Sequence, residues 1–347
     1  MKLTNEQREA VRSGSHTLLV ACPGSGKTRT IVAKLLRCIE EVRDTARRVG
    51  CITYTNAAVD EIDERLRLYG GMDDEQYCEV STIHTFCLNN ILRCFYWRFK
   101  PYRNGFKILP SDSELYLQLA QETLDEHDIS SVSVEAFENL NRLPDGTPIS
   151  EELPAAAART FWKKLQDRGL IDFTNIVYFS YRVLDYVPTV AHALACKFSW
   201  VLVDEFQDTS SLQTEILKRI ADRGKTKFFL VGDPLQSIYS FAGARPELMD
   251  EFAVHLNAKT DCKLLGNFRS STPIITHAER AIRRDPQMYA CGDAVEFQEE
   301  PQYQPVSARF RPLQTTSFRR SIHWELIMAN ARYLLPAGSR CTGLGRC

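Results

Sequence analysis

The stretch that decides the fold is Thr17-Leu18-Leu19-Val20-Ala21-Cys22-Pro23-Gly24-Ser25-Gly26-Lys27-Thr28, in which an apolar run leads into a glycine-rich loop. A continuous apolar run without alternation is typical of a strand buried on both faces of a parallel sheet. After the loop, apolar residues recur at helix spacing, namely Ile31, Val32, Leu35, Leu36 and Ile39. The order of strand, glycine-rich loop and helix predicts a phosphate-binding loop in an α/β protein.

The residues of this loop suit a nucleotide and its metal ion. Backbone N–H groups would surround the phosphates, and the first turn of the helix adds a favourable dipole. Lys27 would reach the β- and γ-phosphates, and the Thr28 hydroxyl would bind Mg²⁺. Ala21 stands where a glycine is usual, and a glycine turn with an incidental lysine is the alternative. The predicted nucleotide-binding residues of the loop are Ala21, Cys22, Pro23, Gly24, Ser25, Gly26, Lys27 and Thr28.

Two adjacent carboxylates follow a second apolar run, residues 200–203. Open parallel sheets place ligands at the carboxyl ends of their strands. We therefore predict that Asp204 binds Mg²⁺ and that Glu205 orients the attacking water. An Asp-Glu pair after a strand can also be a solvated turn, but its combination with the phosphate-binding loop favours the catalytic interpretation.

A third apolar run, residues 228–231, leads into Gly232-Asp233-Pro234-Leu235-Gln236. Its position predicts that Gln236 contacts the γ-phosphate as an uncharged group. Tyr239 and Phe241 follow as exposed aromatic residues beyond the sheet. A further apolar run, residues 51–55, predicts a fourth strand of the same sheet.

The pattern changes between residues 88 and 195, where segments 114–120 and 155–162 are typical of helices and a loop at 143–148 interrupts them. We predict a core domain over 1–87 and 196–264, with a helical insertion over 88–195. Residues 265–347 would then belong to a second domain.

Composition excludes several classes of protein. The 347 residues carry 43 Lys and Arg against 44 Asp and Glu, and no apolar run approaches the roughly 18–20 residues of a membrane span. The polar N-terminus has no signal-peptide core. The 11 cysteines include no C-x-x-C pair, so we expect reduced thiols in the cytoplasm and no membrane partner. Cys87 and Cys94, seven residues apart, would share one face of a buried helix.

The motifs, taken in order, resemble those of the UvrD/Rep family of superfamily 1 DNA helicases. Residues 3–11 resemble the Q motif, and residues 52–58 and 82–86 resemble two motifs that bind single-stranded DNA. Residues 204–208, Asp-Glu-Phe-Gln-Asp, have the family's form of motif II. Residues 231–239 and 267–271 resemble motifs III and IV. The resemblance implies a RecA-like P-loop NTPase core with a helical insertion and part of a second RecA-like domain.

The resemblance also implies roles for the nucleotide contacts. Gln7 would bind adenine, and Phe268 would stack on the base with Arg29 facing it. Arg269 would be an arginine finger that the second domain supplies to the γ-phosphate. ATP and Mg²⁺ are the implied cofactors.

Single-stranded DNA is the implied partner. Residues along its path would be Thr55, Asn56, Thr82, His84, Tyr239 and Phe241. Stacking of bases on aromatic side chains gives a grip that does not depend on a basic surface, so the near-zero net charge is no obstacle. Core packing is the alternative for Tyr54, Tyr239 and Phe241.

The chain departs from the family pattern in its C-terminal part. Ala242 stands where relatives often carry a basic residue, and residues 272–347 lack the later motifs of the second domain. Residues 301–347 hold seven arginines, no lysine and a single acidic residue, Glu325. This atypical tail has three interpretations: a partner-docking C-terminus, a poorly ordered remnant of a longer gene, or a basic nucleic-acid arm.

Two functions follow. The first is an ATP-dependent helicase or translocase on single-stranded DNA, moving 3′ to 5′ as the resemblance implies. The second is a nucleotide- and DNA-binding module or truncated fragment without motor activity of its own, completed by a partner nuclease or helicase subunit.

Overall fold

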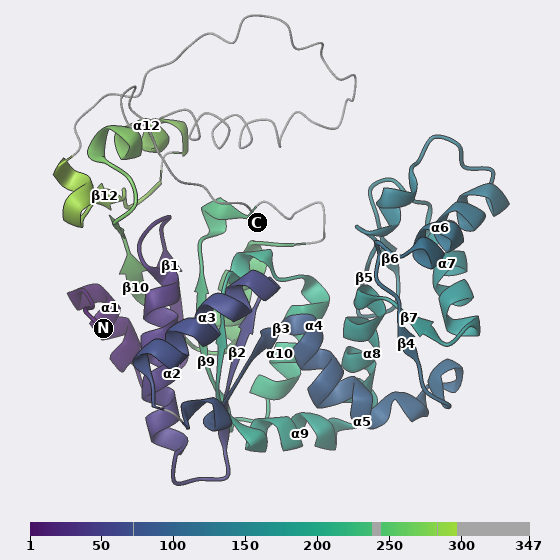
Figure 1. Cartoon of the computed structure of the whole chain (residues 1–347), viewed down its shortest axis with the longest axis horizontal. Coiled ribbons are helices and arrows are strands. Elements are labelled where there is room, and N and C mark those ends of the chain that lie inside the picture. The colour runs from purple at the N-terminus through teal and green to yellow at the C-terminus, as the bar shows by residue number, and fades with distance from the viewer. Residues whose placement is uncertain (72, 238–243, 283, 297–347) are drawn as a thin grey trace, which may run out of the picture. The chain divides into compact units, whose positions relative to one another are not determined.

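The computed structural model describes residues 1–71, 73–237, 244–282 and 284–296, which divide into two units, Met1–Gly266 and residues from Asn267 onward (Figure 1). Tyr239, Phe241, Ala242 and the arginine-rich tail lie outside the described residues. The predictions made for them therefore stay predictions.

A six-stranded parallel sheet forms the centre of the first unit, which confirms the predicted α/β class. Its strand order is β10-β1-β9-β8-β2-β3. The strands are β1 (Thr17–Ala21), β2 (Arg48–Thr53), β3 (Cys78–Thr82), β8 (Phe198–Val203), β9 (Lys227–Gly232) and β10 (Lys259–Leu264).

The four interior strands were predicted, but the two edge strands were not. β3 and β10 have the sequences CEVST and KTDCKL, and in β10 only Cys262 and Leu264 are buried. An edge strand is covered on fewer sides than an interior one and carries charged residues that discourage further pairing. It therefore lacks the continuous apolar run that marked the interior strands.

Helices cover both faces of this sheet. On one face lie α1 (Asn5–Arg12), α2 (Lys27–Val42) and α3 (Asn56–Tyr69); on the other lie α4 (Ile83–Cys87), α8 (Phe173–Tyr186), α9 (Pro188–Lys197), α10 (Ser211–Ala221) and α11 (Glu247–His255). Successive strand residues serve opposite faces. In β9, Phe228 and Leu230 pack with α8 to α11, while Phe229 and Val231 pack with α1 to α3.

The insertion has an apolar core of its own, formed by residues between Leu109 and Leu170. It contains β4 (Lys107–Ile108), α6 (Glu114–Glu126), β5 (Asn141–Arg142), β6 (Pro148–Ile149), α7 (Ala155–Asp167) and β7 (Leu170–Ile171). Figure 1 shows this group beside the sheet-bearing part, joined to it through α5 (Arg93–Phe95) and α8. The predicted helices near 114 and 155 are confirmed, and the predicted loop is the turn of the β5–β6 hairpin.

The expectation that Cys87 and Cys94 share one buried helix face was wrong, because Cys87 is buried and Cys94 is exposed. A π-helical turn, Leu88–Leu92, lies between α4 and α5. Such a turn holds one more residue than an α-helical turn, so every later side chain is rotated by about 100° around the axis.

The second unit is described only from Asn267 to Glu296. It contains α12 (Thr272–Ile282) and β12 (Tyr289–Ala290), while β11 (Gly266–Asn267) spans the junction. Within this unit, the Cys291 backbone N–H donates to the Asn267 carbonyl at 2.8 Å. The prediction of a partial second RecA-like domain falls mostly on residues outside this range.

No helix in the described part of the chain combines the length and the apolar character that a membrane crossing needs. None of the nine described cysteines forms a disulfide with another, and six of them are buried.

A buried lysine joins α1 to the core. Lys34, on α2, is fully buried, and its ammonium group donates to the carbonyls of Ser13 (2.6 Å) and Val11 (3.3 Å) at the end of α1. The same ammonium lies 3.9 Å from the centre of the Trp200 ring. Burial lowers the pKa of Lys34. The two carbonyls and the ring face replace the water molecules that the ammonium group loses on burial.

We expect Lys34→Met to lower the free energy of unfolding by about 2–3 kcal/mol, because two buried carbonyls lose their donor and Trp200 loses its cation. Urea unfolding of the full chain measures this. Lys227→Met is the matched control, because Lys227 also lies over Trp200, at 5.2 Å, but is exposed. Equal effects of the two substitutions would contradict the assigned role of Lys34.

Candidate functional site

The candidate residues of the first unit converge because the sheet is parallel. Lys27 follows β1, Thr55 follows β2, His84 follows β3, Asp204 follows β8 and Asp233 follows β9. The backbone registers match Ile52 with Val203 and Val203 with Leu230, so the strands end at one edge. Lys27 and Asp233, 206 positions apart in sequence, therefore lie at the same sheet edge.

The glycine-rich loop has the backbone of an anion cradle. Gly24 and Gly26 have φ of 69° and 83°, a region that favours glycine. Gly26 is the residue before α2, so the first N–H groups of that helix have no partner within it. A Cβ on Gly26 would lie 2.8 Å from the Gln7 side-chain nitrogen. Only glycine fits here.

Gln7 supports this loop. Its side-chain N–H donates to the Ser25 carbonyl at 2.9 Å, and its side-chain oxygen accepts from the Thr4 backbone N–H at 3.0 Å. Gln7 is 1% exposed, and Thr4 in turn caps α1. Each end of the amide thus has one partner in the protein, and the proposed contact of Gln7 with adenine stays a prediction.

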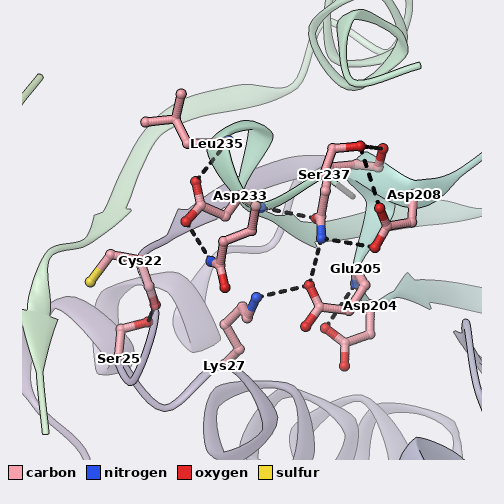
Figure 2. Close-up of polar contacts among 11 residues, drawn as sticks. Cys22, Ser25, Lys27, Asp204, Glu205, Asp208, Asp233, Leu235 and Ser237 are labelled. Carbon is pink, nitrogen blue, oxygen red and sulfur yellow. Dashed lines mark hydrogen bonds and ion pairs between the residues drawn. The ribbon is translucent and has the colours of Figure 1, made fainter. Parts of the chain in front are cut away.

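Lys27 and Glu205 form an ion pair across the site. Figure 2 shows the Lys27 side chain reaching from the loop toward the end of β8, and its ammonium lies 2.8 Å from the Glu205 carboxylate. The two side chains are 14% and 34% exposed. Glu205 has φ of 48°, the left-handed region that is unusual for glutamate, and its carboxylate turns toward Lys27.

Asp204 faces a different environment. Its backbone N–H donates to the Ile52 carbonyl at 2.9 Å, which fixes it to β2. The carboxylate accepts from the Glu205 backbone N–H at 2.9 Å and is 8% exposed. Burial, together with the adjacent Glu205 carboxylate, raises the pKa of Asp204 to about 7. A carboxylate so placed is stabilised by a cation.

A residue that the sequence did not single out, Gln207, connects the two strand ends. Its side-chain N–H donates to Glu205 at 2.8 Å and to Asp208 at 3.3 Å, and its side-chain oxygen accepts from the Asp233 backbone N–H at 3.0 Å. Gln207 is 2% exposed, and a Cβ on Gly232 would lie 2.6 Å from its oxygen. The only sequence signal was its place in the Asp-Glu-Phe-Gln-Asp motif.

Gln236 belongs to the same network. Its side-chain N–H donates to the buried Asp233 carboxylate at 2.5 Å, and Asp233 also accepts from the Leu235 backbone N–H (Figure 2). Ser237 adds donors to the Gln207 carbonyl and to Asp208. A continuous chain of polar contacts thus runs from Lys27 through Glu205, Gln207 and Asp233 to Gln236.

The candidate DNA contacts lie at the ends of β2 and β3. Thr55 and Thr82 each cap a helix with their side-chain oxygen, at 3.2 Å and 3.3 Å, and Asn56 is exposed. His84 contacts Phe173 edge to face, with ring centres 5.6 Å apart. Burial lowers the pKa of His84 to about 4, so its ring is neutral at pH 7.

Tyr54 lies at this edge as well and is only partly buried, so core packing does not account for it fully. Phe173, the exposed partner of His84, was not among the predicted DNA contacts. Phe173 lies within the predicted helical insertion, residues 88–195.

Phe268 and Arg269 belong to the second unit, where both are exposed. The Asn267 side-chain oxygen accepts from the backbone N–H groups of Arg269 (2.8 Å) and Ser270 (2.9 Å), which fixes this turn. Arg29, the predicted partner of Phe268, is exposed on α2 in the first unit. Their proposed meeting at the nucleotide stays a prediction.

The residues present fit a nucleotide with its metal ion. The loop offers glycine backbone at positive φ, the Lys27 ammonium and a hydroxyl at Thr28; the facing strand end offers Asp204 and Glu205. Among the described residues no group of three His, Cys, Asp or Glu side chains could hold a metal ion unaided.

Comparison with known proteins agrees with this geometry. Residues 3–257 match the family described as the UvrD/REP helicase N-terminal domain. The chain is 28% identical over 295 residues to the ATP-dependent DNA helicase PcrA of Staphylococcus aureus (strain Mu50 / ATCC 700699), and 29% identical over 303 residues to the ATP-dependent DNA helicase Rep of Escherichia coli (strain K12). These alignments cover 82% and 83% of the chain. The chain spans 40% and 44% of the two relatives' lengths.

We expect Gly26→Ala to weaken nucleotide binding by at least about tenfold, because alanine must adopt φ near 83° and its Cβ would displace Gln7. Titration with a fluorescent ATP analogue measures the affinity. Gly14→Ala is the control, because no atom lies within 4 Å of a Cβ there. Unchanged affinity in Gly26→Ala would show that the loop conformation does not govern binding.

Proposed function

This chain belongs to the UvrD/REP helicase family, and from that premise we propose that it binds and hydrolyses ATP with Mg²⁺ and couples hydrolysis to movement on single-stranded DNA. The observation that carries the proposal is the polar chain from Lys27 to Gln236, which joins the phosphate-binding loop to two strand ends. A solvated turn would not bury Asp204, Gln207 and Asp233 at 8%, 2% and 0% exposure.

The loop and Lys27 are proposed to hold the phosphates. N–H groups at the start of α2 point toward anions, and Lys27 adds a full charge at the β- and γ-phosphates. Thr28 and Asp204 would hold Mg²⁺, which neutralises charge on those phosphates when bound. The raised pKa of Asp204 means that a cation and this carboxylate stabilise each other.

The Lys27–Glu205 ion pair suggests an order of events. Phosphate oxygens compete for Lys27, so nucleotide binding would separate the pair. Glu205 would then be free to orient a water molecule and to accept its proton. Gln207 keeps a hydrogen bond to Glu205 and would hold it in place after Lys27 leaves.

Gln236 and Arg269 would complete the site. Gln236 is tied to Asp233 at the end of β9, where the chain continues toward residues 238–243. A γ-phosphate contact by Gln236 would therefore alter the position of the residues that follow it in sequence. These include the predicted DNA contacts Tyr239 and Phe241. Arg269 would arrive from the second unit, so that the site is complete only when the two units meet.

Thr55, Asn56, Thr82 and His84 are proposed to line the single-strand path. They lie at the same sheet edge as the nucleotide residues, so movement at one group is transmitted through the strand ends to the other. By family resemblance the proposed direction is 3′ to 5′ and the proposed location is the cytoplasm. A protein partner could supply or complete the second core domain. The alternative is a nucleotide- and DNA-binding module without motor activity.

The deciding measurement is Mg²⁺-dependent ATP hydrolysis by the full chain with and without single-stranded DNA. Stimulation by DNA supports the motor, whereas DNA and nucleotide binding without hydrolysis supports the module. Lys27→Ala should lower kcat/KM for ATP by at least about 100-fold. Thr28→Ala and Asp204→Ala should each weaken the dependence on Mg²⁺.

Glu205→Gln should lower kcat by about 100-fold or more while nucleotide affinity is kept or increased, because Lys27 then loses its competing carboxylate. Glu40→Gln, an exposed carboxylate on α2, is the control and should have no effect. Equal loss of nucleotide binding in Thr28→Ala, Asp204→Ala and Glu205→Gln would show that the roles are misassigned.

A separate prediction concerns Gln207. We expect Gln207→Met to leave nucleotide affinity within about threefold but to lower DNA-stimulated hydrolysis by about tenfold or more, because the link between Glu205 and Asp233 is lost. Gln213→Met is the matched control: Gln213 is also nearly buried and accepts from a backbone N–H, that of Ser210. If both variants lose the stimulation of ATP hydrolysis by DNA equally, the loss reflects a lower stability of the fold and not the link between Glu205 and Asp233.

A further inference from the structure

A basic segment of the insertion has no role in the site described above. Residues 80–111 contain no Asp or Glu, and five cations fall within residues 93–107: Arg93, Arg98, Lys100, Arg103 and Lys107. We call residues 93–107 the basic segment. It runs from α5 to the first residue of β4.

The segment is two-sided. Its aromatic side chains face inward: Phe99 and Tyr102 pack on Phe179 of α8 with ring centres 4.7 Å and 5.1 Å apart, and Phe106 packs on Tyr96 and Tyr102. All five cations are exposed to solvent. Because the aromatic cluster fixes the backbone, the charges are held on a defined surface and not on a loose tail.

Among the described residues, no carboxylate lies within 4.0 Å of any of the five cations. The neighbouring helix α7 differs in this respect, because Lys164 pairs with Glu126 and Arg168 lies 3.9 Å from Glu122. Elsewhere in the first unit, the exposed cations Arg43 and Arg67 pair with Asp74 and Glu75. The basic segment thus concentrates positive charge that the fold does not neutralise.

One aromatic residue of the segment faces outward. Trp97 is 51% exposed, although its indole N–H is fixed by a 3.1 Å hydrogen bond to the Cys94 carbonyl. The Arg98 guanidinium lies 5.7 Å from the ring centre. An exposed, oriented indole between cations is the arrangement on which an unpaired base stacks while its phosphates are neutralised.

The segment lies away from the nucleotide site. Asn90, in the π-helical turn before α5, contacts Lys197 at 2.5 Å and Glu79, which stand at the starts of β8 and β3. The helical run that leaves the carboxyl end of β3 has therefore already reached the opposite edge of the sheet at residue 90. Figure 1 shows α5 following α4 toward the end of the molecule where α9 lies.

We propose that the basic segment is a second DNA-binding surface, which holds single-stranded DNA through Trp97 stacking and through phosphate contacts of Arg98, Lys100 and Arg103. Single-stranded DNA is favoured over a duplex because duplex bases are already stacked and cannot use the indole face. The surface goes beyond the proposed motor site, because it shares no residue with the nucleotide site or with the predicted single-strand path.

The test is fluorescence anisotropy of labelled oligothymidylates of 10 and 30 nucleotides bound to the full chain at several salt concentrations. Each phosphate contact to a single strand contributes about 0.7 to the slope of log K against log salt. Arg98→Gln/Lys100→Gln/Arg103→Gln should therefore lower the slope for the 30-mer by about 2. Trp97→Ala should weaken binding of the 30-mer by about tenfold. The 10-mer, held at the other path, should be much less affected.

The control variant is Arg37→Gln/Arg67→Gln/Lys259→Gln, which removes the same charge from residues that already pair with Glu41, Glu75 and Glu9. If both triple variants weaken binding of the 30-mer equally, the effect comes from net charge alone, and the proposal is overturned. Unchanged affinity for the 30-mer in the Trp97 and basic-segment variants would also overturn the proposal and would leave an acidic protein as the candidate ligand of this surface. ATP hydrolysis should stay normal in all variants, so failure here is distinct from failure of the proposed motor.

Discussion

The parallel alignment of the six central strands is the constraint on which the rest of the structure depends. Their carboxyl ends meet at one edge. The short segments after β1, β2, β3, β8 and β9 are therefore brought together by strand pairing alone. The backbone bonds from Cys22 to Leu264 and from Asp204 to Ile52 fix the first residue after two of these strands. The sheet thus sets the positions, and the loops supply the chemistry. An insertion of about a hundred residues between β3 and β8 leaves that edge intact.

The two adjacent carboxylates at this edge have different electrostatic environments. Asp204 is buried beside a second carboxylate, which raises its pKa, while Glu205 is stabilised by Lys27 and Gln207. Adjacent carboxylates in one motif therefore have different environments, which is compatible with the different roles proposed for them. Gln207 extends the same network to Asp233 and Gln236 at the end of β9. This polar chain is the contact network on which the proposed coupling of nucleotide and DNA binding rests.

Much of the fold and of the nucleotide site could be predicted from the sequence, because both depend on local patterns. The interior strands are short apolar runs. Gly24, Gly26 and Lys27 form a motif whose residue types follow directly from the backbone conformation and the charge that phosphate binding requires. β3 and β10 escaped prediction because an edge strand has no continuous apolar run. The exposure of Cys94 escaped prediction because a single π-helical turn rotates the helix face, and nothing in the local sequence marks it. Gln207 was missed because its partners, Glu205 and the Asp233 N–H, meet only through the pairing of β8 with β9.

The separate apolar core of the insertion has a consequence for how such a chain can evolve. Residues between Leu109 and Leu170 pack chiefly on one another, so substitutions there are insulated from the packing of the central sheet. Selection can accordingly alter the outer face of this appendage, or exchange the appendage whole, at little expense to catalysis. Among related proteins, sequence differences should then accumulate faster in the insertion than in the central sheet and the helices that cover it.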